Sequence, residues 1–226
     1  MRKRRPWRPS LAAWIALLGS GCAGLSTSPQ FPAAIPALAA ENAAAGDPYE
    51  GRFPYEEAIA GLPEGSKLQA ALETDSGTIH CRLERGTPLT VANFVGLARG
   101  IRPFRAADGT WVREPYYDGS PWHRALENQF VQTGQHGALT GPGFRIQDEM
   151  SPGHVFDRAG LLAMANKGAE HSASAQFFVT TSPLPDLNGQ YTIFGSCDDE
   201  HVARELERRI VAGERPVLHR VVISRS

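Results

Sequence analysis

Cysteine is rare in this chain, with only Cys22, Cys81 and Cys197 among 226 residues. There is no CxxC motif and no group of cysteine and histidine at zinc-ligand spacing, so the sequence predicts no metal site. Cys81 and Cys197 each lie in an apolar, strand-like segment, where buried free thiols are common. We favour two buried thiols here. A disulfide is the alternative if the protein is exported.

The N-terminal apolar stretch, Leu11–Leu18, is too short to cross a bilayer as a helix. It follows a basic start and ends in Gly19-Ser20-Gly21-Cys22, which resembles the lipobox of bacterial lipoproteins, although Gly19 replaces the usual aliphatic residue. We therefore expect a signal peptide over residues 1–22 and lipidation of Cys22. A plain secretory signal is the alternative, and both routes export the protein. Ala23, rather than Asp, favours the outer membrane, facing the periplasm of a bacterial cell envelope.

The chain has no excess of basic residues, with 23 Lys and Arg against 24 Asp and Glu. Residues 1–22 hold five of the basic residues and no acidic one, so 18 basic residues face 24 acidic residues in the rest. A surface of that sign does not suit a phosphate backbone, and nucleic-acid binding is not expected. The hydrophobic content of 42% is ordinary for one well-buried core.

Several catalytic motifs are also missing. The sequence contains no G-x-S-x-G nucleophile elbow, no phosphate-binding loop and no His-Glu-x-x-His. It therefore predicts neither a covalent nucleophile nor a cofactor. A metal-dependent hydrolase is an alternative function, but the sequence offers no ligand set for its metal.

Three regions follow from the composition. Residues 1–22 are the signal segment, 23–66 are an Ala/Pro-rich linker, and 67–226 form the folded domain. The segment from Ala23 to about Tyr49 has no sustained periodicity, so we expect a flexible, partly extended spacer. A short helix is expected after it, at Tyr55–Ala60.

From Lys67 the hydrophobic pattern becomes regular. Residues 68–73 and 79–84 alternate apolar and polar residues around Asp75-Ser76-Gly77, which predicts a β-hairpin. Residues 87–100 and 198–213 carry apolar residues at helical spacing. Further strands are expected at Trp122–Thr133, Leu161–Ala165, Gln176–Thr181, Tyr191–Gly195 and Val217–Ser224. The pattern predicts a mainly β fold, a closed antiparallel β-barrel with two helices covering its ends.

Four short segments occur in chain order: Trp122-His123-Arg124, Met164-Ala165-Asn166, Gln176-Phe177-Phe178 and Leu187–Gly195. Together they resemble the cyclophilin family of peptidyl-prolyl cis/trans isomerases. The likeness covers about Leu68 to Ile223. It implies a cyclophilin-like barrel, no cofactor, and an isomerase that acts on X-Pro bonds of other polypeptides.

The family's chemistry fits the absence of a nucleophile. Rotation about a peptide bond must overcome a barrier of about 18–20 kcal/mol that arises from amide resonance, and no covalent bond breaks. A guanidinium aimed at the proline nitrogen would stabilise the lone pair of the twisted amide, while an apolar pocket fixes the ring. Arginine suits this role because it stays charged and presents a rigid fork of donors.

Matching positions imply that Arg124 is the catalytic arginine. The residues implied to bind substrate are Phe130, Gln132, Ala165, Asn166, Gln176, Phe178, Leu187 and Tyr191. Adjacent residues of a strand point to opposite faces, so His123 should face the core if Arg124 faces a groove. By the same rule, one of Phe177 and Phe178 should lie in the core and the other in the pocket.

The sequence departs from the family pattern at several places. Gln129 stands where a pocket phenylalanine is usual, and Asp186 where a tryptophan often contributes to cyclosporin binding. We expect an altered proline pocket and weak cyclosporin sensitivity. The main alternative function is a low-activity cyclophilin-like module that only binds proline-containing segments. In either case we expect a monomer.

Overall fold

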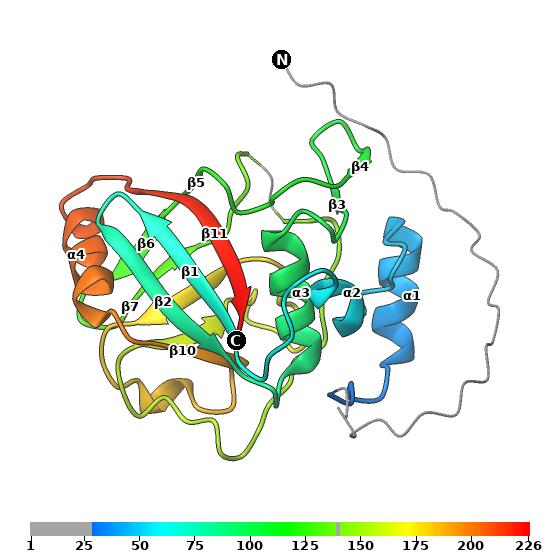
Figure 1. Cartoon of the computed structure of the whole chain (residues 1–226), viewed down its shortest axis with the longest axis horizontal. Coiled ribbons are helices and arrows are strands. Elements are labelled where there is room, and N and C mark those ends of the chain that lie inside the picture. Colours follow the sequence, from blue (N-terminus) through cyan, green and yellow to red (C-terminus); the bar gives the residue numbers. More distant parts are fainter. Residues whose placement is uncertain (1–28, 139–140) are drawn as a thin grey trace.

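The computed structural model describes residues 29–138 and 141–226. The main element is a nine-stranded antiparallel sheet in the order β5-β11-β1-β2-β10-β8-β9-β7-β6 (Figure 1). Its strands are β1 (Leu68–Thr74), β2 (Gly77–Leu83), β5 (Ser120–Pro121), β6 (Arg124–Leu126), β7 (Phe130–Thr133), β8 (Leu161–Met164), β9 (Phe177–Thr180), β10 (Ile193–Cys197) and β11 (Val217–Arg225). The predicted mainly β fold is confirmed.

The prediction of a closed barrel is wrong, because the two edge strands, β5 and β6, do not pair with each other. They follow one another in the chain and are separated only by Trp122 and His123. The N–H of Trp122 donates to the Pro216 carbonyl at 2.9 Å, and that of His123 to the Gln132 carbonyl at 3.2 Å. The two residues of this crossing thus bond to the chain on either side, β5 pairs with β11 and β6 with β7, and the sheet curls into an open half-barrel.

The two predicted helices are present as α3 (Pro88–Ala98) and α4 (Glu200–Val211). They lie on opposite sides of the curled sheet (Figure 1). All residues of α3 are buried, whereas α4 packs its Val202, Ala203 and Leu206 face against β2, β6 and β7. The short 3₁₀-helix η1 (Pro185–Leu187) precedes β10.

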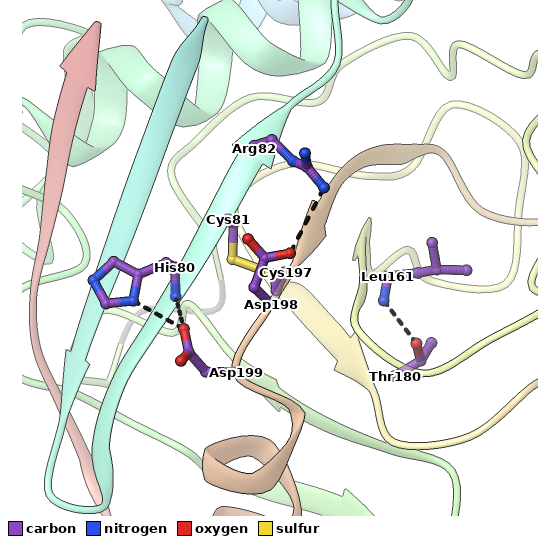
Figure 2. The surroundings of a disulfide bond; sticks show 8 residues. All are labelled: His80, Cys81, Arg82, Leu161, Thr180, Cys197, Asp198 and Asp199. Atoms are coloured by element: carbon purple, nitrogen blue, oxygen red, sulfur yellow. Dashed lines mark hydrogen bonds and ion pairs between the residues drawn. A yellow bond between two sulfur atoms is a disulfide. The ribbon is translucent and has the colours of Figure 1, made fainter. Parts of the chain in front are cut away.

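The predicted hairpin at the start of the domain is confirmed as β1 and β2. Leu72 lies opposite Ile79, and both side chains are fully buried. The preference for two free thiols is wrong, because Cys81 on β2 and Cys197 on β10 lie directly opposite each other and form a disulfide (Figure 2). The two cysteines are 116 residues apart in the chain, so only the pairing of β2 with β10 brings them together.

The prediction of an extended spacer is wrong for Pro36–Ala45, which form helix α1. Alanine has the highest helix propensity, Pro36 stands in the first turn where proline is favoured, and Gly46 ends the helix with a φ of 89°. The predicted short helix is confirmed as α2 (Tyr55–Ile59).

The segment that carries these helices packs against the domain instead of extending from it. Helix α2 lies beside α3, and α1 lies on the far side of α2 (Figure 1). The fully buried Phe53 ring lies against α3 at Gly96, where any side chain would collide with it. A small second sheet, β3 (Phe104–Arg105) with β4 (Trp111–Val112), lies between α3 and β5 in the chain. Residues 29–138 and 141–226 contain no helix with the length and apolar character needed to cross a membrane. Cys22 and the predicted signal segment lie outside the described residues.

Candidate active site

A hairpin of β6 and β7 positions Arg124. The predicted single strand over Trp122–Thr133 is wrong, because Asn128 adopts a left-handed φ of 57° and turns the chain. The turn places Arg124 directly opposite Gln132, and the Arg124 Nη1 donates to Gln132 Oε1 at 3.1 Å. The guanidinium carbon lies 5.1 Å from the centre of the Phe130 ring. Arg124 thus projects from the sheet edge, exposed to solvent and oriented by its neighbour.

A chain of hydrogen bonds continues from Gln132 into the neighbouring strands. The Gln132 Nε2 donates to Gln176 Oε1 at 2.8 Å. The Gln176 carbonyl in turn accepts the Ala165 N–H at 2.9 Å. Gln132 is buried, so its amide has little freedom to turn away from these partners. Four of the residues predicted for the site are therefore connected in one line.

An apolar cluster lies on the same face of the sheet. Its centre is Phe178, whose ring is 5.1 Å from that of Phe130, 5.5 Å from that of Tyr191 and 5.9 Å from that of Phe156. This cluster is separate from the main core, and its buried members are Phe130, Phe156, Leu161, Ala163, Phe178 and Ile193, with the partly buried Ala165, Leu184, Leu187 and Tyr191 against them. The predicted apolar pocket residues thus belong to one group beside Arg124.

Asn166 lies at the rim of this region. Its Nδ2 donates to the Gln190 carbonyl at 2.8 Å, and its Oδ1 accepts the Gly168 N–H at 3.0 Å. Within the described residues, the backbone N–H and carbonyl of Asn166 have no hydrogen-bond partner. A cavity of about 270 Å³ lies beside it and is lined in part by Asp148, Met150 and Tyr191. A backbone with free donors and acceptors next to a hollow can bind an extended peptide.

Residues 69–226 match the family model described as "Cyclophilin type peptidyl-prolyl cis-trans isomerase/CLD". The chain belongs to this family. The match begins at β1 and reaches the last residue of the chain, and the expected family membership is confirmed.

Similar proteins agree with this family. Peptidyl-prolyl cis-trans isomerase A of Mycobacterium tuberculosis is 39% identical over 142 residues, which are 61% of this chain and 78% of that protein. Peptidyl-prolyl cis-trans isomerase B of Streptomyces anulatus is 39% identical over 138 residues, 59% of this chain and 78% of that protein. The predicted isomerase activity is supported by the family and by the names of these relatives.

Solved structures of the family have the same fold. A cyclophilin-type isomerase from Cryptosporidium parvum superposes with a TM-score of 0.59 at 26% sequence identity, over 71% of this chain and 99% of that one. A second structure of the same parasite protein, obtained in the presence of the dipeptide Ala-Pro, gives a TM-score of 0.57. The N-terminal segment with α1 lies outside the residues that match the family model.

The arrangement provides a cation and an apolar surface side by side. In the described part of the chain, Arg124 forms no ion pair, so no carboxylate neutralises its guanidinium. No three His, Cys, Asp or Glu side chains of these residues gather closely enough to hold a metal ion.

Strand alternation around the site is as predicted. Phe177 is fully buried in the main core, whereas Phe178 lies in the apolar cluster of the site. Met164 packs in the main core. His123, just before β6, is partly buried; burial lowers the pKa of its imidazole, while hydrogen bonds with Pro121 and Gln176 raise it.

Phe156 is a member of the apolar cluster that the sequence did not reveal. It lies in an irregular loop, where hydrophobic periodicity gives no signal. The Asn188 Oδ1 accepts its N–H at 2.7 Å, and its carbonyl accepts the Leu184 N–H at 2.8 Å. These two bonds hold its ring against Phe178. Only the tertiary fold brings the loop to the site.

Gln129 does not reach the apolar cluster. Its side chain is exposed, its N–H donates to Glu207 Oε1 at 3.1 Å, and its carbonyl accepts the Thr181 N–H at 2.7 Å. The neighbouring Phe130 supplies the aromatic ring on the side of Arg124.

Proposed function

We propose that this isomerase lowers the barrier to X-Pro rotation through the guanidinium of Arg124. The proline ring lies against the cluster around Phe178, and the guanidinium donates toward the amide nitrogen as it loses conjugation. The observation that carries this mechanism is the connected line Arg124–Gln132–Gln176 beside the apolar cluster. The interaction strengthens only in the twisted amide, so it accelerates the reaction instead of merely tightening binding.

The other residues hold the peptide. Gln132 orients the guanidinium, Phe130 and Tyr191 border the ring, and Leu187 lies on the outer side of the cluster. The free backbone groups of Asn166 bind the peptide chain next to the proline. Because Ala165 is tied to Gln176 by its N–H, this edge stays fixed relative to the guanidinium.

Substitution of Arg124 tests the mechanism. In exchange NMR on a short proline peptide, we expect Arg124→Ala to lower the catalysed rate about 100-fold, the cost of removing one preorganised donor. Arg124→Lys should restore only part of it, because a point charge lacks the fork. Arg204→Ala, an exposed arginine of α4, is the control and should have full activity.

The same experiment distinguishes the alternative function. The observation that favours a binding module is Gln129, which places no aromatic ring in the cluster. A binding module would bind the peptide in a titration. The peptide's cis/trans exchange would nevertheless proceed at the uncatalysed rate with both wild type and Arg124→Ala. Catalysis by wild type that is lost in Arg124→Ala would reject that alternative.

We propose further that the protein is exported and anchored by a lipid at Cys22, where it acts on proline bonds of polypeptides in the cell envelope. The basic start, the short apolar stretch and Cys22 support export, and the Cys81–Cys197 disulfide suits an oxidising compartment. Mass spectrometry of the native N-terminus tests the anchor. An acylated Cys22 is the expected result, and an unmodified N-terminus at another residue would contradict it.

A further inference from the structure

A second, larger cavity lies beside the candidate active site. Its volume is about 540 Å³, and it is bounded by helix α1, the β3–β4 hairpin and the loop around Arg145. The polar residues that line it include Glu41, Asn42, Arg105, Arg145, Lys167 and Ser174. Helix α1 lies outside the family match, so this wall is a feature of the present chain and not of the family domain.

Hydrogen bonds fix the walls of this cavity. The side chain of Asn42 on α1 is buried, its Nδ2 donates to the Arg145 carbonyl at 2.9 Å, and its Oδ1 accepts the Arg145 N–H at 2.9 Å. On the hairpin, the Arg105 N–H donates to the Pro142 carbonyl at 2.9 Å. Three segments that are distant in sequence are therefore tied together around one hollow.

The cavity continues into the region predicted to bind the peptide. Lys167 and Ser174 line both this cavity and a smaller hollow of about 60 Å³. The smaller hollow is also lined by Ala165, Asn166 and Gln176. A peptide whose backbone pairs with Asn166 therefore has its next residues at the mouth of the larger cavity.

The charge in the cavity is positive. Arg105, Arg145 and Lys167 line it together with one carboxylate, Glu41, which pairs with Arg145. Arg105 and Lys167 are both exposed, and neither forms an ion pair with any described residue. Two cations therefore remain for a ligand. Their sign is opposite to that of residues 23–226 as a whole, which carry 18 basic and 24 acidic residues.

The hollow on the other side of Asn166 differs in sign. It is lined by Asp148 and Glu170 and by no Lys or Arg. The peptide-binding region is thus basic toward α1 and acidic toward Tyr191. Such a difference favours a peptide with an acidic side chain toward α1 and a basic one toward Tyr191. The opposite arrangement places like charges together, which repel each other.

We propose that the cavity between α1 and the β3–β4 hairpin is a specificity subsite for an acidic side chain of the substrate, two to four residues from the proline. This inference rests on the proposed function, since it extends the same peptide site. Arg105 and Lys167 are specificity residues and take no part in the rotation of the bond. The acidic side chain enters beside Lys167 and Ser174 and lies between the two cations.

The test compares peptides that differ only in one residue. Glu, Gln or Lys is placed two, three or four residues before or after the proline, and catalysed exchange is measured by NMR below saturation. Wild type should act on one Glu peptide about fivefold faster than on its Gln counterpart, a size typical of two solvent-exposed charge pairs. Raising the salt concentration should reduce the preference.

The variant Arg105→Gln/Lys167→Gln should lose that preference while its rate on the Gln peptides is unchanged. The matched control Arg82→Gln/Arg204→Gln removes two exposed arginines outside the cavity and should keep the preference. The inference is overturned if wild type treats Glu and Gln peptides alike, or if the double cavity variant keeps the preference.

Failure of the proposed function would look different. In that case wild type would not accelerate any peptide, including the Gln series. Titration of the same peptides, with the backbone signals of Asn166 and Lys167 as the readout, still measures the Glu preference in binding. Equal affinities for the Glu and Gln peptides would overturn the subsite regardless of turnover.

Discussion

One buried carboxylate caps helix α3. Thr87, the residue before the helix, makes no side-chain capping bond, and Pro88 has no N–H to donate. The free N–H groups of Leu89 and Thr90 donate instead to the two oxygens of Glu149, at 3.0 and 2.7 Å. Burial raises the pKa of Glu149, while these hydrogen bonds to the carboxylate lower it. The helix thus depends on a residue about 60 positions further along the chain.

We expect Glu149→Ala to lower the free energy of unfolding by about 2–3 kcal/mol, because two buried N–H groups lose a charged acceptor. Glu149→Gln keeps one acceptor oxygen and should lose less. Urea denaturation followed by circular dichroism measures both. An exposed acidic residue, Glu205, is the control, and equal stabilities of Glu149→Ala and Glu205→Ala would contradict the capping role.

His123 makes stability depend on pH. Burial lowers the pKa of its imidazole, and its Nδ1 has no hydrogen-bond partner within the described residues. The folded state therefore prefers the neutral ring. The neutral imidazole therefore contributes stability above its pKa in the unfolded chain, about 6.5. That stability is lost as the pH falls through its lower pKa in the folded protein.

We expect wild type to lose more stability than His123→Gln between pH 7.5 and pH 5. Buried carboxyls such as Asp148 and Glu149, whose pKa burial raises, act in the opposite sense and are present in both proteins. The difference between the two unfolding curves therefore isolates the imidazole. Parallel curves across this range would show that protonation of His123 does not oppose folding.

The alternation of strand side chains between the two faces of the sheet could be predicted from the sequence, whereas contacts made by loop residues could not. The split between Phe177 and Phe178 follows from the geometry of any strand. The place of Phe156 depends on a loop held by Asn188 and Leu184, and no local pattern encodes such a contact. The site residues that could be predicted are those that lie on strands or within the four segments that resemble the family.

The turn between β6 and β7 shows the same limit at the scale of elements. Residues 122–133 were predicted as one strand, because the apolar pattern runs through them. Asn128 tolerates the left-handed conformation better than most residues, and its φ of 57° reverses the chain there. The error matters for function, since only the hairpin sets Arg124 opposite Gln132.

The N-terminal segment is held by a buried ion pair. Asp47 follows α1, and its Oδ2 lies 3.2 Å from Arg102 Nη2, with neither side chain exposed. The guanidinium carbon is also 3.7 Å from the centre of the Phe144 ring. Burial lowers the pKa of Arg102 to about 10, so the side chain remains charged at neutral pH and needs its partner.

Asp47→Ala should destabilise the protein by about 3–5 kcal/mol, because it leaves a buried guanidinium without a counter-charge. It also removes the carboxylate that accepts the Tyr49 and Gly51 N–H groups. We expect faster proteolytic cleavage within residues 29–66 and a lower urea midpoint. Asp157→Ala, an exposed partner of Arg158, serves as the control. If both variants are cleaved at the wild-type rate, the ion pair does not anchor the segment.

At the scale of the whole molecule, the disulfide joins the first hairpin of the domain to the second-to-last strand. Short-range patterns predicted each strand, but the pairing of β2 with β10 is a long-range property of the fold. Polar contacts lie on either side of this link: Arg82 forms an ion pair with Asp198, and the His80 N–H and imidazole hydrogen-bond to Asp199 (Figure 2). Each cysteine is buried, which is why a free thiol was the simpler expectation.

The loop closed by the disulfide spans 116 residues, more than half of the chain. Cross-links of this length restrict the unfolded chain strongly, and we expect Cys81→Ser/Cys197→Ser to lower the free energy of unfolding by about 2–4 kcal/mol. Guanidinium denaturation with and without dithiothreitol measures the effect. Dithiothreitol should destabilise wild type and leave the double variant unchanged.

Activity should respond differently from stability. Cys81 and Cys197 belong to the main core, whereas the line from Arg124 to Gln176 lies beside the separate apolar cluster. Below the unfolding transition, the double variant should therefore catalyse exchange at the wild-type rate. A loss of activity in a variant that is still folded would mean that the strand pair β2–β10 positions the site through β8, which lies next to β10 in the sheet.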